Sequence, residues 1–234
     1  LTSCNEKPFQ IESKFDNGNP EIIYLQLSDT TIHGKTYNRK FKIEFNKQKD
    51  TLRKGLYINK MAMGDHLFYE NNKLICKRNY IVPNPFFIDI DNENETVDYS
   101  AFKIRIDSTY LNSVIYFNQI GDSIIKKSDF YKANFWKKKW KINDSLKVEF
   151  EFYCPNYEII KSKLYFVVPE DKSKITVVYN TNKNYIFKRK IFDKKHNQIN
   201  GLVEIITFDK SKKIEDSTAF EKRIMFINED FIIE

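Results

Sequence analysis

Apolar and polar residues alternate with a period of two along most of the chain. The clearest run covers residues 146–152, where Lys147, Glu149 and Glu151 separate apolar residues. Because successive side chains of a β-strand point to opposite faces, this run predicts a strand that buries one face. Further runs rich in β-branched and aromatic residues predict strands at residues 22–27, 41–45, 102–106, 114–117, 163–168, 175–179, 185–192, 202–208, 223–228 and 231–233.

Turn-forming residues separate these runs, and helical periodicity is weak. Only residues 129–139 have a pattern that suits one or two helical turns. Many short strands separated by turns are typical of sandwiches and barrels. The sequence therefore predicts an all-β fold, an antiparallel β-sandwich-like architecture with one or two sandwich domains after a short tether.

A domain boundary is expected near the prolines of Val82-Pro83-Asn84-Pro85, because proline cannot donate a hydrogen bond within a central strand. The polar, acidic residues that follow are typical of an exposed loop. The expected organisation is a short tether at 1–20, an N-terminal β-rich region at 21–96 and a C-terminal β-sandwich-like domain at 97–234.

The net charge is +7 and the isoelectric point is about 9.0. Most of the lysines alternate with Asp and Glu along the predicted strands, which is typical of solvated sheet faces. We therefore expect no nucleic-acid partner, and acidic glycans or anionic head groups suit this surface better. No segment approaches the ~20 apolar residues that a membrane-spanning helix needs.

The first four residues, Leu1-Thr2-Ser3-Cys4, resemble the recognition site of bacterial lipoproteins. The resemblance implies that Cys4 carries a lipid and that the polar segment after it is a tether. It also implies a lipid-anchored location in the bacterial cell envelope, periplasmic or surface-exposed. The alternative is an ordinary N-terminal cysteine.

Lipidation of Cys4 would leave two of the three cysteines, Cys76 and Cys154. Disulfides persist in the periplasm and on cell surfaces, so these two residues are a candidate disulfide pair. Two buried free thiols are the alternative, because a free cysteine behaves as a small hydrophobic residue.

Two further resemblances concern local structure only. Residues 64–80 resemble one unit of the variant MORN repeat, with Asn72 in place of the usual turn glycine, and this implies a hairpin at 67–75. Residues 188–208 resemble the strand, polar turn and strand that open carboxypeptidase-regulatory-like or transthyretin-like sandwiches. Neither resemblance implies an enzymatic activity.

Few residues suggest catalysis or metal binding. The three histidines, His33, His66 and His196, lie in turn-like contexts, and no nucleophile or metal-ligand motif accompanies them. The weak metal candidates are Asp89, Asp91 and Glu93, whose alternating carboxylates suit Ca²⁺. A solvated acidic loop is the alternative, and we expect no cofactor.

Both tryptophans, Trp136 and Trp140, flank Lys137, Lys138 and Lys139. If they are exposed, their rings stack on sugars while the lysines attract acidic groups. If they are buried, the lysines extend into water.

The sequence favours a non-enzymatic cell-envelope lipoprotein with a binding, assembly or structural role. Its expected partners are the membrane, through the N-terminal lipid, and a protein or an acidic glycan. The alternatives are a glycan hydrolase with an unrecognised carboxylate pair and an immunity or inhibitor protein.

Overall fold

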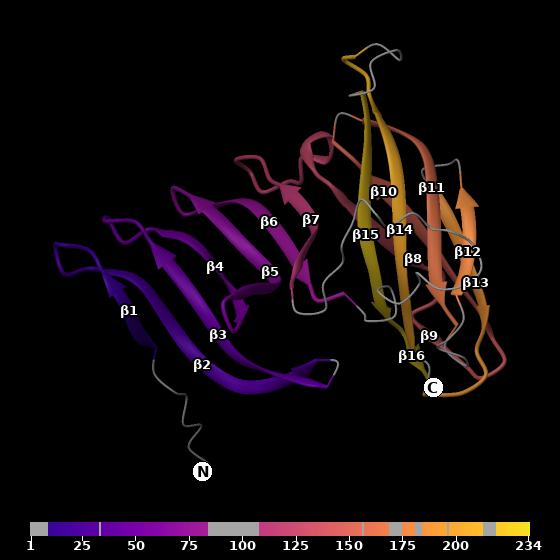
Figure 1. The fold of residues 1–234 in the computed structure, drawn as a ribbon, viewed down its shortest axis with the longest axis horizontal. Coiled ribbons are helices and arrows are strands. Elements are labelled where there is room, and N and C mark those ends of the chain that lie inside the picture. The colour runs from indigo at the N-terminus through magenta and orange to yellow at the C-terminus, as the bar shows by residue number, and fades with distance from the viewer. Residues whose placement is uncertain are drawn as a thin grey trace. The chain divides into compact units, whose positions relative to one another are not determined.

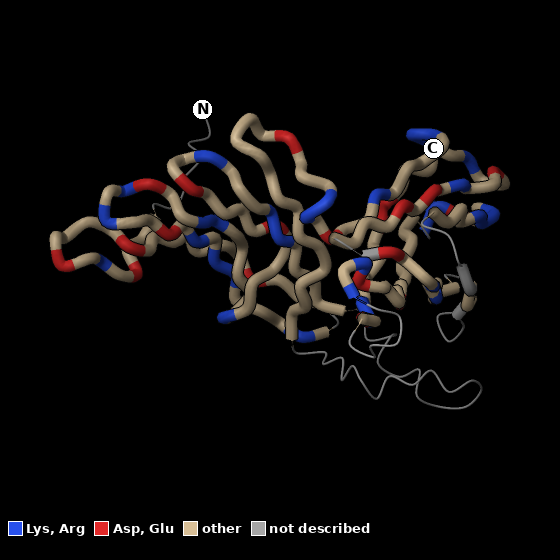
Figure 2. Tube along the Cα trace, turned by 90° about the horizontal axis from the view of Figure 1, so that it is seen from above, with Lys and Arg blue, Asp and Glu red and all other residues tan. Residues whose placement is uncertain are grey.

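The computed structural model describes residues 9–32, 34–83, 108–155, 157–168, 175–180, 184–195, 197–212 and 219–234. The described residues form an all-β protein, which confirms the expected fold class. The chain divides into two compact units. Among the described residues, the first unit contains 9–83 and 108–124, and the second contains 125–234. Figure 2 shows Lys and Arg interspersed with Asp and Glu along the strands of both units.

The first unit is a seven-stranded antiparallel sheet in which every strand pairs with the next one along the chain (Figure 1). The strands are β1 (Gln10–Lys14), β2 (Pro20–Ile32), β3 (Lys35–Phe45), β4 (Thr51–Ile58), β5 (Met61–Glu70), β6 (Lys73–Ile81) and β7 (Tyr110–Tyr116).

Asparagines form the tight turn between β5 and β6. Asn71 and Asn72 have φ angles of 48° and 59°, a left-handed conformation that asparagine tolerates better than most residues. The strands on either side pair from Glu70↔Lys73 onward. This arrangement confirms the hairpin expected at residues 67–75.

The domain boundaries differ from the expected ones at two places. β1 and the first residue of β2 lie within the expected tether at 1–20, so the folded part begins before residue 21. β7 pairs with β6, so the chain returns to the first sheet after residue 107, and the second unit continues from Ile125 and not from residue 97. Residues 1–8 and 84–107 lie outside the described residues, and so do Cys4, the Asp89, Asp91 and Glu93 loop, and the strand expected at 102–106.

The second unit contains two antiparallel sheets of three and four strands. The three-stranded sheet has the order β13 (Asn184–Lys190), β10 (Ser145–Tyr153) and β8 (Phe130–Phe135). The four-stranded sheet has the order β12 (Ile175–Asn180), β11 (Tyr157–Val167), β14 (Gln198–Asp209) and β15 (Phe220–Asp230). A 3₁₀ turn, η3 (Ile125–Lys127), and a parallel pair of β9 (Lys139–Trp140) with β16 (Ile232–Ile233) complete the unit.

Two local expectations change in this unit. The helical turns expected at 129–139 are wrong, because β8 occupies most of that stretch. The expected strand, turn and strand at 188–208 are present as β13 and β14. However, β13 belongs to the three-stranded sheet and β14 to the four-stranded one, so this turn connects the two sheets.

The core of the second unit lies between its two sheets. Alternate residues of β10, namely Leu146, Val148, Phe150 and Phe152, are all 0% exposed, as the sequence pattern predicted. They pack against inward residues of the facing sheet: Leu164, Phe166, Val203, Ile205, Met225 and Ile227. Full burial of a large apolar side chain contributes roughly 1.5–3 kcal/mol, so this shared layer holds the sheets together as a sandwich.

The first unit contains a buried histidine that the sequence did not predict. His66 lies in β5 and is 1% exposed, so its expected turn-like context was wrong. Its ring covers Gly55 on the neighbouring strand, and a Cβ at Gly55 would lie 2.5 Å from His66 Cγ. His66 Nε2 lies 2.7 Å from the carbonyl oxygen of Leu56. A glycine on β4 therefore provides the space that the imidazole fills.

Candidate functional site: a basic and aromatic sheet face

The outer face of the three-stranded sheet holds the strongest candidate site. Because side chains alternate, the residues between the core positions of β10 and β13 point away from the sandwich. One end of this face combines lysines with exposed apolar side chains. We call it the basic-aromatic face, and it consists of Trp136, Lys147, Ile186, Lys188, Lys190 and Phe192.

The register of the strands brings these residues together. The backbone N–H of Trp136 donates to the carbonyl of Lys147 at 3.2 Å, which continues the β8–β10 pairing beyond β8. On the other side of β10, Lys147 is directly opposite Lys188. Two residues along β13, Lys190 is opposite Ser145. Trp136, Lys147 and Lys188 therefore lie side by side across three strands, and Lys190 lies beside this row of residues. Residues 136 and 190, which are 54 positions apart in the sequence, become neighbours in this way.

The apolar members of the face are unusually exposed. Trp136 is 59% exposed, Phe192 58% and Ile186 44%. The Nζ of Lys147 lies 4.8 Å from the centroid of the Trp136 ring, and the Nζ of Lys190 lies 5.8 Å from that of Phe192. These cation–π contacts keep positive charge beside two accessible rings.

In the described part of the chain, the lysines of this face have no acidic partner. Among the described residues, none of Lys147, Lys188 and Lys190 forms an ion pair. Like charges directly opposite each other destabilise a sheet, so the Lys147–Lys188 pair weakens the fold. A bound anionic group would remove that repulsion.

Hydrogen-bond acceptors lie next to the lysines on the same face. Asn184 Nδ2 donates to Glu149 Oε1 at 3.0 Å, and Asn134 Nδ2 donates to Glu151 Oε1 at 3.0 Å. These contacts hold the two carboxylates in fixed positions. Because a carboxylate can accept several hydrogen bonds, each keeps capacity for a ligand's donors.

The structure separates the two tryptophans that the sequence grouped. Trp136 is exposed, but Trp140 is 2% exposed and belongs to the sandwich core. Lys137 pairs with Asp144 at 3.3 Å and Lys139 with Glu234 at 2.8 Å, so they serve local contacts. Lys138 is exposed. Of the residues expected to form the ligand surface, Trp136 therefore lies on the basic-aromatic face, whereas Trp140 is a core residue.

Sequence reasoning missed Lys147, Lys188, Lys190 and Phe192. Lys147 lies in a run that alternates apolar and charged residues, and the other three lie in the strand predicted at 185–192, so all four read as parts of ordinary strands. The only local signal was the spacing of Lys188 and Lys190, which places both on one face. Their position next to Trp136 depends on the strand register.

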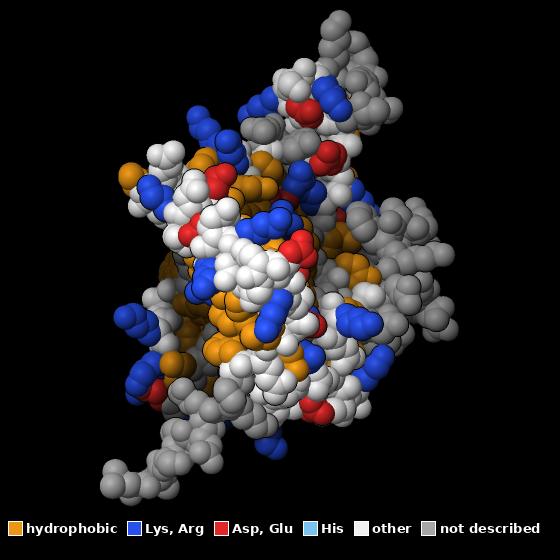
Figure 3. All heavy atoms as spheres, turned by 90° about the vertical axis from the view of Figure 1, so that its left-hand side faces the viewer, with side chains coloured by type: hydrophobic (Ala, Val, Ile, Leu, Met, Phe, Trp, Pro, Cys, Tyr) orange, Lys and Arg blue, Asp and Glu red, His pale blue; other side chains and the backbone are white. Residues whose placement is uncertain are grey.

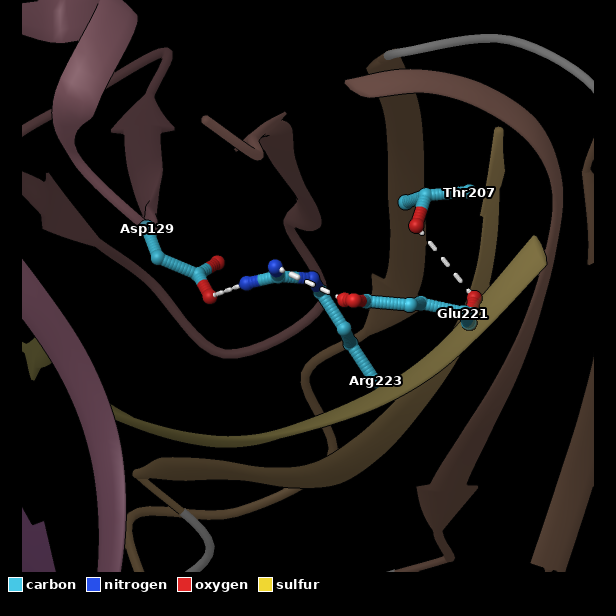
Figure 4. Close-up of polar contacts among 4 residues, drawn as sticks. All are labelled: Asp129, Thr207, Glu221 and Arg223. Carbon is cyan, nitrogen blue, oxygen red and sulfur yellow. Dashed lines mark hydrogen bonds and ion pairs between the residues drawn. The ribbon is translucent and has the colours of Figure 1, made fainter. Parts of the chain in front are cut away.

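A second polar cluster lies at one end of the sandwich (Figure 4). Arg223 of β15 points inward, forms an ion pair with Asp129 just before β8, and also contacts Glu221 at 3.1 Å. Thr207 Oγ1 donates to the carbonyl of Glu221 at 3.3 Å. Figure 4 shows the guanidinium of Arg223 between the two carboxylates. This cluster links the two sheets where the apolar core ends.

Burial dominates the electrostatics of this cluster. Desolvation raises the pKa of Asp129, and the positive charge of Arg223 opposes that shift. Burial also raises the pKa of the nearby Cys154 thiol to about 12, which keeps it protonated. Because Arg223 engages both carboxylates and the thiol is not ionised, these groups are better placed for a structural contact than for acid–base or nucleophilic catalysis.

A groove of about 1160 Å³ opens beside this cluster. Apolar and charged side chains contribute to its lining, among them Lys126, Phe152, Cys154, Glu158 and Lys210. Lys210 and Glu158 form an ion pair at 3.5 Å, so the charges of the lining partly cancel. The groove consequently presents no concentrated charge to a ligand.

The candidate disulfide is not formed in the structure. Cys76 is buried in β6 of the first unit, Cys154 follows β10 in the second unit, and both are free thiols. This is the alternative that the sequence left open.

Among the residues that the structure describes, no group of three or more His, Cys, Asp or Glu side chains is arranged to hold a metal ion. Within the same residues, no helix has the length and hydrophobicity needed to span a bilayer. His33 and His196 lie outside the described residues. Comparisons with protein-family models, with curated proteins and with solved structures give no match to this chain.

Proposed function

We propose that this chain is a non-enzymatic, lipid-anchored protein of the bacterial cell envelope that binds an envelope component through the basic-aromatic face. The observation that carries the binding role is the exposure of Trp136 beside Lys147, Lys188 and Lys190, which have no acidic partner among the residues that the structure describes. An exposed indole lowers solubility, and a repulsive pair of lysines lowers stability. Two such unfavourable features on one face favour a binding role for it.

The anchoring part of the proposal rests on the Leu1-Thr2-Ser3-Cys4 motif. Attachment of a lipid to Cys4 would place the folded units at a membrane surface and raise the local concentration of envelope ligands. Expression of the full-length gene with a labelled fatty-acid analogue tests this part. Label on the parent protein that is lost in Cys4→Ala supports the anchor, and absence of label from both proteins contradicts it.

The binding role is tested by co-sedimentation of the purified chain with isolated cell-wall sacculi and with outer-membrane vesicles. We expect the parent chain to sediment with one of these materials, and Trp136→Ala to reduce the bound fraction several-fold. Truncation of an exposed indole removes stacking area without disturbing the core.

Ile120→Ala is the matched control, because Ile120 is 83% exposed and belongs to the first unit, whereas the basic-aromatic face belongs to the second. It should bind as the parent chain does. Equal losses in Trp136→Ala and Ile120→Ala, or no sedimentation of the parent chain with either material, would refute a specific role for the face.

A further inference from the structure

The spacing of the charges on the basic-aromatic face restricts the ligand. Neighbouring strands are about 5 Å apart, and alternate residues of one strand are about 7 Å apart. Lys147, Lys188 and Lys190 therefore form a compact array of ammonium groups. Lys147 and Lys188 face each other across two strands, and Lys188 and Lys190 lie two residues apart along β13. A ligand that repeats its anionic groups matches this array better than a single small anion.

Trp136 adds a flat stacking surface next to the array. Trp136 is 59% exposed, and the centroid of its ring lies 4.8 Å from the Nζ of Lys147. An indole stacks on the apolar side of a sugar ring or on a nucleobase, and the adjacent ammonium attracts an acidic substituent of the same ligand. The ligand should therefore contain both rings and anionic groups.

The carboxylates on the same face favour a sugar ring over a nucleobase as the group that stacks on Trp136. Glu149 is opposite both Asn134 of β8 and Ile186 of β13, so its carboxylate lies one row from the Lys147–Lys188 pair. A single strand of DNA would place phosphates near the negative charges of Glu149 and Glu151, and its backbone has no hydroxyl group to donate to them. Sugar hydroxyls, in contrast, donate hydrogen bonds to carboxylates.

We infer, on the basis of the function proposed for this face, that its ligand is an acidic polysaccharide whose sugar units carry carboxylate groups. A sugar ring stacks on Trp136, and its carboxylates contact Lys147, Lys188 and Lys190. Hydroxyl groups of the neighbouring unit donate to Glu149 and Glu151. The flat, open sheet face accommodates an extended polymer that passes over several rows of residues.

The test is isothermal titration calorimetry on the full chain carrying Cys4→Ser, so that no lipid is attached. The probes are polygalacturonate as a carboxylated polysaccharide, dextran as a neutral one, and single-stranded oligothymidylate as a polyphosphate. We expect salt-sensitive binding of polygalacturonate, no heat with dextran, and at least roughly tenfold weaker binding of oligothymidylate.

Two variants locate the site. Trp136→Ala and the double variant Lys188→Glu/Lys190→Glu should each weaken polygalacturonate binding roughly tenfold or more, because they remove stacking and reverse the local charge. The control is Lys60→Glu/Lys73→Glu, which makes the same change in net charge at exposed lysines of the first unit and should bind within about twofold of the parent. Circular dichroism spectra confirm that all variants are folded.

The inferred ligand class is refuted by absence of polygalacturonate binding, by equal binding of dextran, or by tighter binding of oligothymidylate. It is also refuted if the two double variants weaken binding equally, which would indicate net charge alone. If the parent chain still co-sediments with envelope material through Trp136 but ignores polygalacturonate, only the ligand class fails. If both assays are negative, the proposed function fails with it.

Discussion

His66 shows how a single residue depends on its neighbour across a strand. Its imidazole lies over Gly55, between the rings of Tyr57 and Tyr80, whose centroids are 4.9 and 5.2 Å from that of His66. The 2.7 Å contact from Nε2 to the Leu56 carbonyl indicates that the neutral imidazole carries its proton on Nε2. Glycine and histidine thus form one unit of packing in the first sheet.

Substitution of this pair should give non-additive effects. We expect Gly55→Ala to destabilise the first unit by about 1–3 kcal/mol, since its Cβ would lie 2.5 Å from the imidazole. We expect His66→Ala to cost about 2 kcal/mol through the lost packing. In the double variant the new methyl group occupies vacated space, so the total should fall below the sum by about 1 kcal/mol or more. Urea unfolding of the four proteins measures this coupling, and strict additivity would show that the two residues do not pack together.

The stability of the first unit should depend on pH through His66. Burial lowers the pKa of His66 below its ordinary value of 6.5, so the unfolded chain takes up a proton at a higher pH than the folded chain. Its contribution to stability is therefore complete above about pH 6.5 and is lost as the pH falls below that value. We expect a lower urea midpoint at pH 5.5 than at pH 7.5.

The variant His66→Phe controls for other groups that titrate in this range, because it keeps an aromatic ring and removes the titration. The difference between the midpoints at the two pH values should be smaller in His66→Phe than in the parent. An identical difference in both proteins would assign the pH dependence to other residues.

At the scale of elements, alternation in the sequence identified most strands and their inward residues. β10 is the best example, because its apolar positions are all in the core. Alternation did not predict the positions of Trp136 and Trp140 correctly, because the sequence pattern placed both in one environment. A bend at 136–138 separates the end of β8 from the short strand β9, so the alternation does not continue between the two tryptophans. β9 pairs with the distant β16, and Trp140 is buried there.

The two tryptophans should therefore respond differently to truncation. We expect Trp140→Ala to destabilise the second unit by about 3–5 kcal/mol, because it removes a core side chain. Trp136→Ala should change stability by no more than about 0.5 kcal/mol, because its side chain is largely in water.

Fluorescence checks the assignment independently. In Trp140→Phe, the remaining Trp136 should emit at long wavelength and be quenched readily by acrylamide. In Trp136→Phe, the remaining Trp140 should emit at shorter wavelength and resist quenching. The reverse pattern would exchange the two environments and remove the basis of the candidate site.

At the scale of the whole molecule, the two units bury their residues in different ways. The second unit has a continuous core between two sheets, whereas the buried hydrophobic residues described in the first unit are Tyr37, Ile58, Cys76 and Val82. Figure 3 views the side on which β1 lies in Figure 1, and hydrophobic side chains are visible there between Lys and Arg side chains. Many apolar side chains of the first sheet are only half-buried, so each stabilises the unit less than a core residue does.

We consequently expect two unfolding transitions in urea, with the first unit unfolding at the lower concentration. His66→Ala should lower only the first midpoint, and Phe150→Ala should lower only the second. Far-ultraviolet circular dichroism detects both transitions, and tryptophan fluorescence reports on the second unit, which contains Trp136 and Trp140. A single transition that both variants shift equally would show that the units unfold together.

The sequence by itself determined the all-β class, the strands with clear alternation and the hairpin at Asn71 and Asn72, because strand periodicity and turn conformation depend on residues that are close in the chain. The tertiary structure alone decided that the first seven strands form one sheet, that β7 returns to it, and that β13 and β14 belong to different sheets. It also decided that Trp136 joins Lys147 and Lys188 while Trp140 enters the core. These features depend on the register between strands and on the packing of one sheet against another, and both bring together residues that are far apart in sequence.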